Sequence, residues 1–326
     1  MKQAGAARTS REVQAVYDEL YAGGEMSLSK NYSDKFPLLE HLLAPEVRGR
    51  SVLDFGCGPG RLALMLARHA REVRGVDYAA PGVAMAGLLA RAAGVTNASF
   101  AAGDLDAVVA EGRPWDVIVL AGVLEHLERP EAQLAALARL LPSGGVLCLQ
   151  TPSFANFRGD VYNTLGALLG LPMSLTDLWQ VTPKTVQALA AALGLELERI
   201  VGGHYHLAYL ERVLEDLRQR VPAAARDAGQ GSGWRWEPFF AWIADRVEQN
   251  RALLDAWVAT GALKPVPRPA PLRGARPAGL DEALWASLER YLTYDGWREP
   301  YYSDVEPVCA LGASAVYFLR KGPRRE

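Results

Sequence analysis

The stretch SVLDFGCGPGRLALMLA, residues 51–67, decides the fold, because it joins an apolar strand to an apolar helix through a glycine-rich turn. The strand is Ser51–Phe55, and the turn holds Gly56, Gly58 and Gly60. Glycine accepts positive φ and lets a ligand approach the backbone without meeting a Cβ atom. The first N–H groups of a helix and its positive dipole end attract an anionic group. The stretch therefore predicts a ligand site at the carboxyl end of a strand.

Apolar strands alternate with helices from this stretch onward. Strands are expected at Ser51–Phe55 and at residues 72–76, 98–101, 116–120, 145–150, 195–202 and 314–321. Helices are expected between them, for example at residues 61–70, 131–141 and 183–193, the last with Thr182 as its N-cap. Continuous apolar strands separated by helices favour a parallel sheet covered on both faces. We therefore predict an α/β, Rossmann-like fold.

The segment from about residue 204 to residue 308 breaks this alternation. It carries helical patterns at residues 208–220, 237–259 and 281–294, with an extended proline-rich linker at residues 264–279. We predict a helical insertion between the last two strands, which forms a small core or a homodimer contact, or lines a substrate site with its aromatic residues. The expected organisation is an N-terminal helical cap at 1–38, a core at 39–203, the insertion or lid at 204–308 and a closing strand at 309–326.

The composition is that of a globular protein without a global charge preference. The chain has 326 residues, 50% of them hydrophobic, with 35 Lys and Arg against 37 Asp and Glu. This balance gives no general attraction to nucleic acid or anionic lipid, so we do not expect a nucleic-acid partner. The three cysteines, Cys57, Cys148 and Cys309, lie far apart and form no disulfide or zinc pattern. Because we find no signal peptide and no apolar run of about 20 residues, we expect a cytoplasmic protein.

Acidic residues follow the strands at the edge where the glycine turn lies. Asp54 lies within the first strand, Asp77 follows the second, and Asp104 follows the third. A carboxylate at the tip of the second strand can accept hydrogen bonds from both hydroxyls of a ribose. Asp104 can accept one from an adenine amino group, with Tyr78 or Leu105 against the ring. The glycine spacing, GxGxG rather than GxGxxG, disfavours a nicotinamide dinucleotide and the oxidoreductases that use it.

Four motifs in this order resemble those of class I S-adenosylmethionine-dependent methyltransferases: VLDFGCGPG, GVDYA, GDLDA and DVIVLAGVLEHL, the last followed by ARLLPSGGVLCLQTP. The resemblance covers about residues 39–202 and the closing strand. It implies a seven-stranded sheet whose last strand is antiparallel, S-adenosylmethionine as the cofactor and S-adenosylhomocysteine as the product. It also implies the cofactor contacts: Asp54, Gly56, Gly58 and Gly60 at the amino acid end, Asp77 at the ribose, Asp104 and Leu105 at the adenine, and Cys57, Tyr78 and Ala121 beside them.

The segment VLEHL is similar to the Glu-His pair of the ubiquinone-biosynthesis O-methyltransferases. The resemblance implies that Glu125 and His126 are catalytic, with His126 as the base, since histidine titrates near neutral pH. Some of those relatives bind a divalent metal through a further glutamate three positions before the pair. Here that position is Gly122, so we expect no metal. His204 and His206, expected on one face of the sixth strand, are candidate ligands or bases, although a structural role is the main expectation.

The acceptor side is predicted from position along the chain, because no motif covers it. We expect residues 153–180, the N-terminal helix and the insertion to close over the cofactor. Candidate substrate contacts are Tyr17, Tyr21, Tyr162, Trp179, His204 and His206. The predicted reaction is methyl transfer to a small molecule, foremost to oxygen, in the biosynthesis of a cofactor or specialised metabolite. The alternatives are transfer to nitrogen or carbon, an RNA methyltransferase, and a module that binds S-adenosylmethionine without transferring its methyl group.

Overall fold

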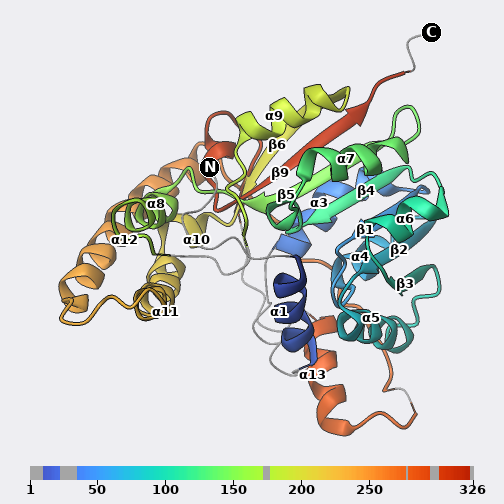
Figure 1. The fold of residues 1–326 in the computed structure, drawn as a ribbon, viewed down its shortest axis with the longest axis horizontal. Helices are drawn as coiled ribbons and strands as arrows, with labels where there is room; N and C mark the ends of the chain where they lie inside the picture. Colours follow the sequence, from blue (N-terminus) through green and yellow to red (C-terminus); the bar gives the residue numbers. More distant parts are fainter. Residues whose placement is uncertain (1–9, 23–34, 172–176, 277, 294–300, 324–326) are drawn as a thin grey trace.

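A computed structural model describes residues 10–22, 35–171, 177–276, 278–293 and 301–323 of the chain (Figure 1). Parts of the expected cap, residues 1–9 and 23–34, lie outside the described residues. The strands are β1 (Ser51–Phe55), β2 (Glu72–Asp77), β3 (Ala98–Ala102), β4 (Val117–Ala121), β5 (Val146–Pro152), β6 (Leu195–Gly203), β7 (Lys264–Pro265), β8 (Tyr301–Ser303) and β9 (Ser314–Lys321).

The described helices come before the first of these strands and between the later ones. They are α1 (Ser10–Ala22), α3 (Lys35–Val47), α4 (Arg61–Leu66), α5 (Ala80–Ala92), α6 (Leu105–Glu111), α7 (Pro130–Arg139), α8 (Phe157–Leu169), α9 (Pro183–Ala192), α10 (Tyr205–Tyr209), α11 (Glu211–Asp227), α12 (Trp236–Ala259) and α13 (Glu282–Thr293). Two short 3₁₀ helices are η1 (Leu124–His126) and η2 (Val308–Leu311). None of the described helices has the length and apolar character needed to cross a membrane.

The strands form one sheet with the order β3-β2-β1-β4-β5-β9-β6-β8-β7. From β3 to β5 the neighbours run parallel, as the alternation of strands and helices predicts. Strand β9 lies between β5 and β6 and is antiparallel to both. The sheet of the described residues has nine strands and not the seven that the resemblance implies, because β8 pairs with β6 and β7 pairs with β8. Both extra strands lie within the predicted insertion, outside its predicted helices: β7 at the start of the expected linker and β8 after the last expected helix.

Helices cover both faces of the sheet because side chains along a strand point alternately to the two faces. In β4, Ile118 and Leu120 pack with α6, α7 and α9, whereas Val117 and Val119 pack with α3 and α4. All four side chains are fully buried. Burial of one such side chain stabilises a fold by about 1.5–3 kcal/mol. This double-sided burial explains why the strands read as continuous apolar runs.

The segment between β6 and β9 packs in two separate places (Figure 1). Helices α11 and α12 pack against α8 and form a lobe beside the sheet. Farther along, α13 packs against α4 and α5, on the other side of the molecule from this lobe. The expected extended linker between α12 and α13 begins as strand β7, and its Leu272 is buried among α4, α5 and α13. The segment between β6 and β9 therefore adds β7 and β8 to the sheet, supplies α11 and α12 to the lobe, and covers α4 and α5 with α13.

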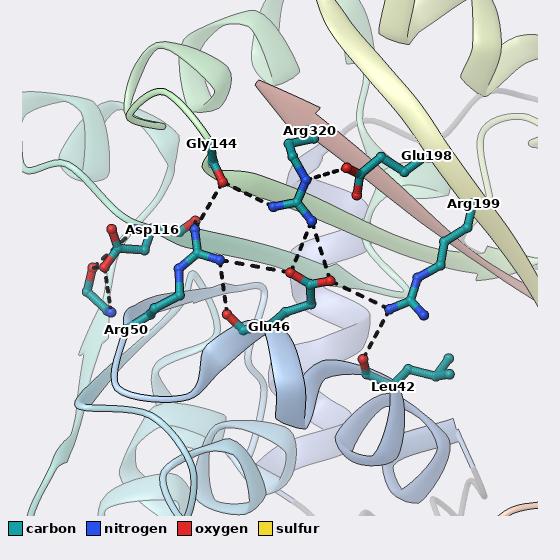
Figure 2. Close-up of polar contacts among 9 residues, drawn as sticks. Leu42, Glu46, Arg50, Asp116, Gly144, Glu198, Arg199 and Arg320 are labelled. Atoms are coloured by element: carbon teal, nitrogen blue, oxygen red, sulfur yellow. Dashed lines mark hydrogen bonds and ion pairs between the residues drawn. The ribbon is translucent and has the colours of Figure 1, made fainter. Parts of the chain in front are cut away.

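A group of charged side chains lies at the edge where β1, β4 and β5 begin (Figure 2). At its centre, the Glu46 carboxylate contacts three guanidinium groups, those of Arg320 at 3.2 Å, Arg199 at 3.8 Å and Arg50 at 3.9 Å. These contacts tie α3 to β6 and β9. We call the following six residues the basal network: Glu46, Arg50, Asp116, Glu198, Arg199 and Arg320.

Asp116 carries the second carboxylate of the basal network. Its Oδ2 accepts hydrogen bonds from the backbone N–H and the hydroxyl of Ser51, at 2.9 Å and 2.8 Å. Burial alone would raise the pKa of Asp116, but these hydrogen bonds and the nearby Arg50 and Arg71 outweigh it and lower the pKa. Arg50 also donates to the backbone carbonyl of Asp116 at 3.2 Å. At the amino-terminal edge of the sheet, the carboxylates of Glu46 and Asp116 therefore both have ion-pair or hydrogen-bond partners.

Candidate active site

A cavity of about 620 Å³ opens at the edge where β1, β2 and β4 end, opposite the basal network. Open parallel sheets bind their ligands at this edge. The cavity is lined by these predicted cofactor residues: Asp54, Gly56, Cys57, Gly58, Asp77, Tyr78, Asp104, Leu105 and Ala121. It is also lined by these predicted catalytic and substrate residues: His126, Tyr17 and Tyr21. The structure therefore brings most of the predicted site together.

The glycine turn forms the floor of the cavity. Gly56, Gly58 and Gly60 have φ values of 78°, 49° and 75°, a region that other residues adopt only at a cost. A Cβ atom on Gly56 would lie 2.3 Å from Cγ2 of Val123, so no larger residue fits there. Gly60 does not line the cavity, because it packs against α5 and Phe100 instead. Its predicted contact with the cofactor stays a prediction.

Two carboxylates stand at the ends of β2 and β3. The oxygens of Asp77 accept hydrogen bonds from the N–H groups of Gly58 at 2.7 Å and Ala79 at 2.8 Å. These bonds fix the Asp77 carboxylate beside the glycine turn, and each oxygen retains a lone pair for a ligand. Asp104 caps α6 by accepting a hydrogen bond from the N–H of Ala107 at 3.1 Å. Asp104 therefore combines a capping role with a place in the cavity wall.

Opposite charges meet where β1 and β4 end. The Asp54 carboxyl is 1% exposed, and its Oδ2 has no hydrogen-bond partner among the described residues. Burial, followed by the charge of Asp77, raises the pKa of Asp54 to about 7. Lys35 lies nearby, and its Nζ donates to the Ala121 carbonyl at 3.4 Å. Burial lowers the pKa of Lys35, although Glu125 and Asp54 oppose that shift.

Sequence reasoning missed Lys35 altogether. It lies at the first residue of α3, and its side chain reaches the end of β4, which is 86 positions away in sequence. No local pattern marks such a contact, because it depends on how α3 packs on the sheet. A cationic group nevertheless lines the cavity beside the glycine turn.

His126 lies at the end of η1, with its ring in the cavity wall. Its Nε2 is 3.2 Å from the Tyr17 hydroxyl, and its Nδ1 is 3.6 Å from Oδ1 of Asp177. Asp177 was not among the predicted site residues. It precedes α9 by several residues and belongs to no motif, so no local pattern marks its position beside His126.

Glu125 takes a different position from the one expected of a catalytic partner. Its carboxyl is 4% exposed and does not line the cavity, because η1 turns it toward the interior. Its Oε2 has no hydrogen-bond partner among the described residues. Burial, followed by the charge of Asp177, raises the pKa of Glu125 to about 8. This carboxyl therefore holds its proton to a higher pH than an exposed glutamate does.

Helix α1 covers the cavity from the side of α5 (Figure 1). The Tyr21 hydroxyl lies 2.7 Å from the position that a Cβ atom on Gly58 would take. The Tyr17 ring lies 5.9 Å from the His126 ring and 6.3 Å from the Tyr78 ring. Tyr17 and Tyr21 therefore contact both the predicted cofactor turn and the predicted base.

Four predicted substrate residues lie outside the cavity lining. Tyr162 is buried between α8 and α11, where its hydroxyl donates to Asp216 at 2.5 Å. Trp179 packs against the core on the α6, α7 and α9 face. The expectation of His204 and His206 on one strand face is wrong: β6 ends at Gly203, His204 has a φ of 60°, and His206 lies on α10 beside the Tyr301 ring. The apolar side chains of residues 154–171 pack within the lobe, and Trp179 packs in the core, whereas residues 172–176 lie outside the described residues.

Comparison with known proteins agrees with this arrangement. The family model of the methyltransferase domain matches residues 28–215, more than half of the chain. The chain belongs to this family. The methyltransferase is similar to the ubiquinone biosynthesis O-methyltransferase of Coxiella burnetii, with 31% identity over 164 residues, covering 49% of this chain and 69% of that protein.

Two further proteins extend the comparison. The methyltransferase is 35% identical over 161 residues to the ubiquinone biosynthesis O-methyltransferase of Roseobacter denitrificans, covering 48% of this chain and 64% of that protein. Among solved structures, the [4+2]-cyclase SpnF matches with a TM-score of 0.50 at 17% identity, covering 99% of this chain and 100% of that one. This second likeness concerns the fold alone.

S-adenosylmethionine is the cofactor of this methyltransferase, and the cavity fits it. Gly56 and Gly58 leave backbone exposed where any Cβ atom would fill the space. The buried Oδ2 of Asp54 is an acceptor that suits a ligand ammonium group. The positioned carboxylate of Asp77 suits ribose hydroxyls. The donor and acceptor set thus matches the amino acid and nucleoside ends of the cofactor.

The divalent metal of some relatives does not fit this site. One ligand atom each from Glu125, His126 and Asp177 lie within 4.8 Å of one another, a spacing that a cation could bridge. However, the Lys35 Nζ lies 2.9 Å from the position of a Cβ atom on Gly122, where those relatives carry their further glutamate. The Lys35 side chain therefore takes the place of that ligand, and in its protonated form it would repel a metal ion. We derive no step through a metal, and its absence remains a prediction.

Proposed function

We propose that this methyltransferase transfers a methyl group to an oxygen atom of a small-molecule acceptor, with His126 as the base. The observation that carries the proposal is the 3.2 Å contact between Nε2 of His126 and the Tyr17 hydroxyl inside the cavity. An O–H group therefore fits against this nitrogen at hydrogen-bond distance. An acceptor hydroxyl that binds in place of the Tyr17 hydroxyl can give its proton to His126.

The polar groups on the cofactor side support a matching set of roles. Asp54 accepts from the ammonium of the amino acid end, and Lys35 pairs with its carboxylate. Asp77 accepts from the ribose hydroxyls, and Asp104 accepts from the adenine amino group. This order places the reacting end of the cofactor next to Ala121 and His126.

The reaction needs alignment and the removal of one proton. Bound S-adenosylmethionine supplies an electrophilic methyl group, which forms a bond to the acceptor oxygen as its bond to sulfur breaks and leaves S-adenosylhomocysteine. His126 accepts the proton of the acceptor hydroxyl at Nε2 and later releases it to solvent. The rings of Tyr17 and Tyr78 exclude water from this side of the cavity. General-base assistance of this kind contributes about 10²–10⁴-fold to a rate.

The names of the relatives favour oxygen over other acceptor atoms. Both relatives described above are named ubiquinone biosynthesis O-methyltransferases.

We assign residues 1–38 as the cap on the cavity, 39–203 with 309–326 as the catalytic core, and 204–308 as an elaboration. The lobe of α8, α11 and α12 does not line the cavity, so it supports a role in shape or partner contacts better than a role in chemistry.

The test measures S-adenosylhomocysteine formed from S-adenosylmethionine with three probe acceptors: catechol, benzoate and benzylamine. We expect product with an oxygen acceptor, and we expect His126→Ala to lower kcat by about 10²–10⁴-fold. Its affinity for S-adenosylhomocysteine should change by less than about threefold, because the cofactor contacts remain.

The matched control is His41→Ala, since His41 lies on α3 against the Tyr302 ring, outside the cavity lining. This variant should keep the wild-type rate. Product with benzylamine but not with catechol or benzoate would move the reaction to nitrogen. Full turnover in His126→Ala would remove His126 from the mechanism.

A further inference from the structure

The two ring nitrogens of His126 face different groups. Nε2 faces the Tyr17 hydroxyl at 3.2 Å, on the acceptor side of the cavity. Nδ1 lies on the other side of the ring, 3.6 Å from Oδ1 of Asp177. A neutral imidazole carries one proton, and the group beside one nitrogen decides which nitrogen keeps the lone pair. The neighbour of Nδ1 therefore decides whether Nε2 can act as a base.

The chain segment that carries Asp177 is fixed against the His126 segment. The backbone N–H of Leu178 donates to the Glu125 carbonyl at 2.8 Å. The next residue, Trp179, packs into the core beneath α9. These contacts hold Asp177 in place without using its carboxylate.

The Asp177 and His126 side chains lie in a region with little water. They are 12% and 14% exposed. Charges interact more strongly in such surroundings than in bulk water. When His126 accepts a proton, the resulting imidazolium lies next to the Asp177 carboxylate, which stabilises it.

We propose that Asp177 is a positioning residue for His126: its carboxylate accepts a hydrogen bond from Nδ1–H and leaves the lone pair on Nε2. This inference rests on the proposed function, in which His126 is the base. A distance of 3.6 Å is longer than a formed hydrogen bond. Catalytic hydrogen bonds are often long before substrate binds and shorten in the reacting complex.

The other charged and titratable groups around the ring leave this role to Asp177. They are Tyr17 on α1, Lys35 at the start of α3, Glu125, Glu128 and Arg129 next to His126 in sequence, and Arg220 on α11, whose charge interacts with Asp177. Burial and the charge of Asp177 raise the pKa of Glu125 to about 8, so Glu125 holds its proton to a higher pH than an exposed glutamate does. Its side chain is buried and is not part of the cavity lining. Asp177 is thus the carboxylate placed to orient the ring.

The test is ¹⁵N-histidine NMR of the full chain, with and without S-adenosylhomocysteine, so it needs no acceptor. The signals of His126 are identified by their loss in His126→Gln. In the wild type we expect the neutral ring to carry its proton on Nδ1. In Asp177→Asn we expect the His126 titration midpoint to move to lower pH by about 1 pH unit, because a stabilising negative charge is lost. In Asp177→Glu we expect the midpoint to return most of the way to the wild-type value, because the negative charge is kept.

Asp255→Asn is the matched control, because Asp255 is exposed on α12 and outside the cavity lining. It should leave the His126 signals unchanged. A proton on Nε2 in the wild type, or an unchanged midpoint in Asp177→Asn, would overturn the inference. So would an Asp177→Asn chain that unfolds, or a shift of the His126 ring signals on addition of Mg²⁺, which would make the residues metal ligands. If His126→Ala loses turnover while Asp177→Asn leaves the midpoint unchanged, the proposed function stands and this inference fails.

Discussion

The two edges of the same sheet hold their acidic side chains in opposite electrostatic situations. At the edge where the strands begin, Glu46 contacts three guanidinium groups, and Asp116 accepts two hydrogen bonds that help to lower its pKa. At the edge where the strands end, Asp54 and Glu125 are buried with raised pKa values, and each has an oxygen without a partner among the described residues. The first edge is arranged to stabilise the protein. The second keeps polar groups ready for a ligand at a cost in stability.

The largest difference between the edges should come from adding a methyl group to a glycine. In Gly56→Ala the new Cβ meets Val123 at a φ of 78°, so we expect the free energy of unfolding to fall by about 2–5 kcal/mol. Affinity for S-adenosylhomocysteine should fall with it. Gly94→Ala, near the start of β3, has a φ of 64° but nothing within 4 Å of the new atom. It should cost only about 1–2 kcal/mol, measured by urea unfolding, and leave affinity unchanged. Equal costs at both positions would contradict the crowding at Gly56.

A second difference should appear in the dependence of stability on pH. Because the folded pKa of Asp54 is raised to about 7, the folded state holds a proton that the unfolded state releases between about pH 4 and pH 7. Stability from this group is therefore lost as pH rises through that window. Asp54→Asn should be more stable than the wild type at pH 8, by about 2–4 kcal/mol, and nearly equal at pH 4. Urea unfolding without cofactor at both pH values measures this.

Asp116→Asn provides the opposite case from the basal network. Its folded pKa is lowered, so its stabilisation is present above its unfolded pKa and is lost as pH falls through the folded value. This variant should be less stable than the wild type at pH 8, by about 1 kcal/mol, with a smaller gap in acid. If both variants change stability in the same direction at pH 8, the contrast between the edges does not hold.

The smallest effect is expected from the centre of the basal network. Glu46→Gln leaves three guanidinium groups without their shared carboxylate, but all of these side chains are partly exposed. We expect a loss of about 1 kcal/mol in unfolding free energy, reduced by salt, with no change in turnover. The control, Glu248→Gln, removes an exposed pair with Arg251 on α12 and should cost less than about 0.5 kcal/mol. A loss of turnover in Glu46→Gln would contradict this prediction, because it would show that the basal network affects the active site at the opposite edge of the sheet.

Sequence reasoning succeeded where one local pattern controls the structure. The strand Ser314–Lys321 has the predicted bounds, and Thr182 caps α9 as expected. The glycine turn and Asp77 lie together in the cavity because a strand, a tight turn and a helix fix their geometry within a few residues.

The remaining features depend on packing between distant segments. Lys35 and Asp177 reach the site from α3 and from the segment before α9, and no spacing within the sequence reports that. His204 was misplaced because its positive φ ends β6 at a point where the alternation of residues would have continued. Tyr162 was predicted to contact substrate, but its side chain is covered by α11, which lies about 50 positions later in the sequence.

The position of β9 has a consequence for how the protein is made. This strand lies between β5 and β6, yet it is synthesised after all the other described strands. Until Ser314–Lys321 has left the ribosome, β5 and β6 have no shared neighbour, and their unpaired backbone groups are open to incorrect pairing. A stop codon anywhere before residue 314 would therefore remove a central strand rather than an edge. We expect such truncated chains to aggregate during translation instead of folding into a slightly smaller enzyme.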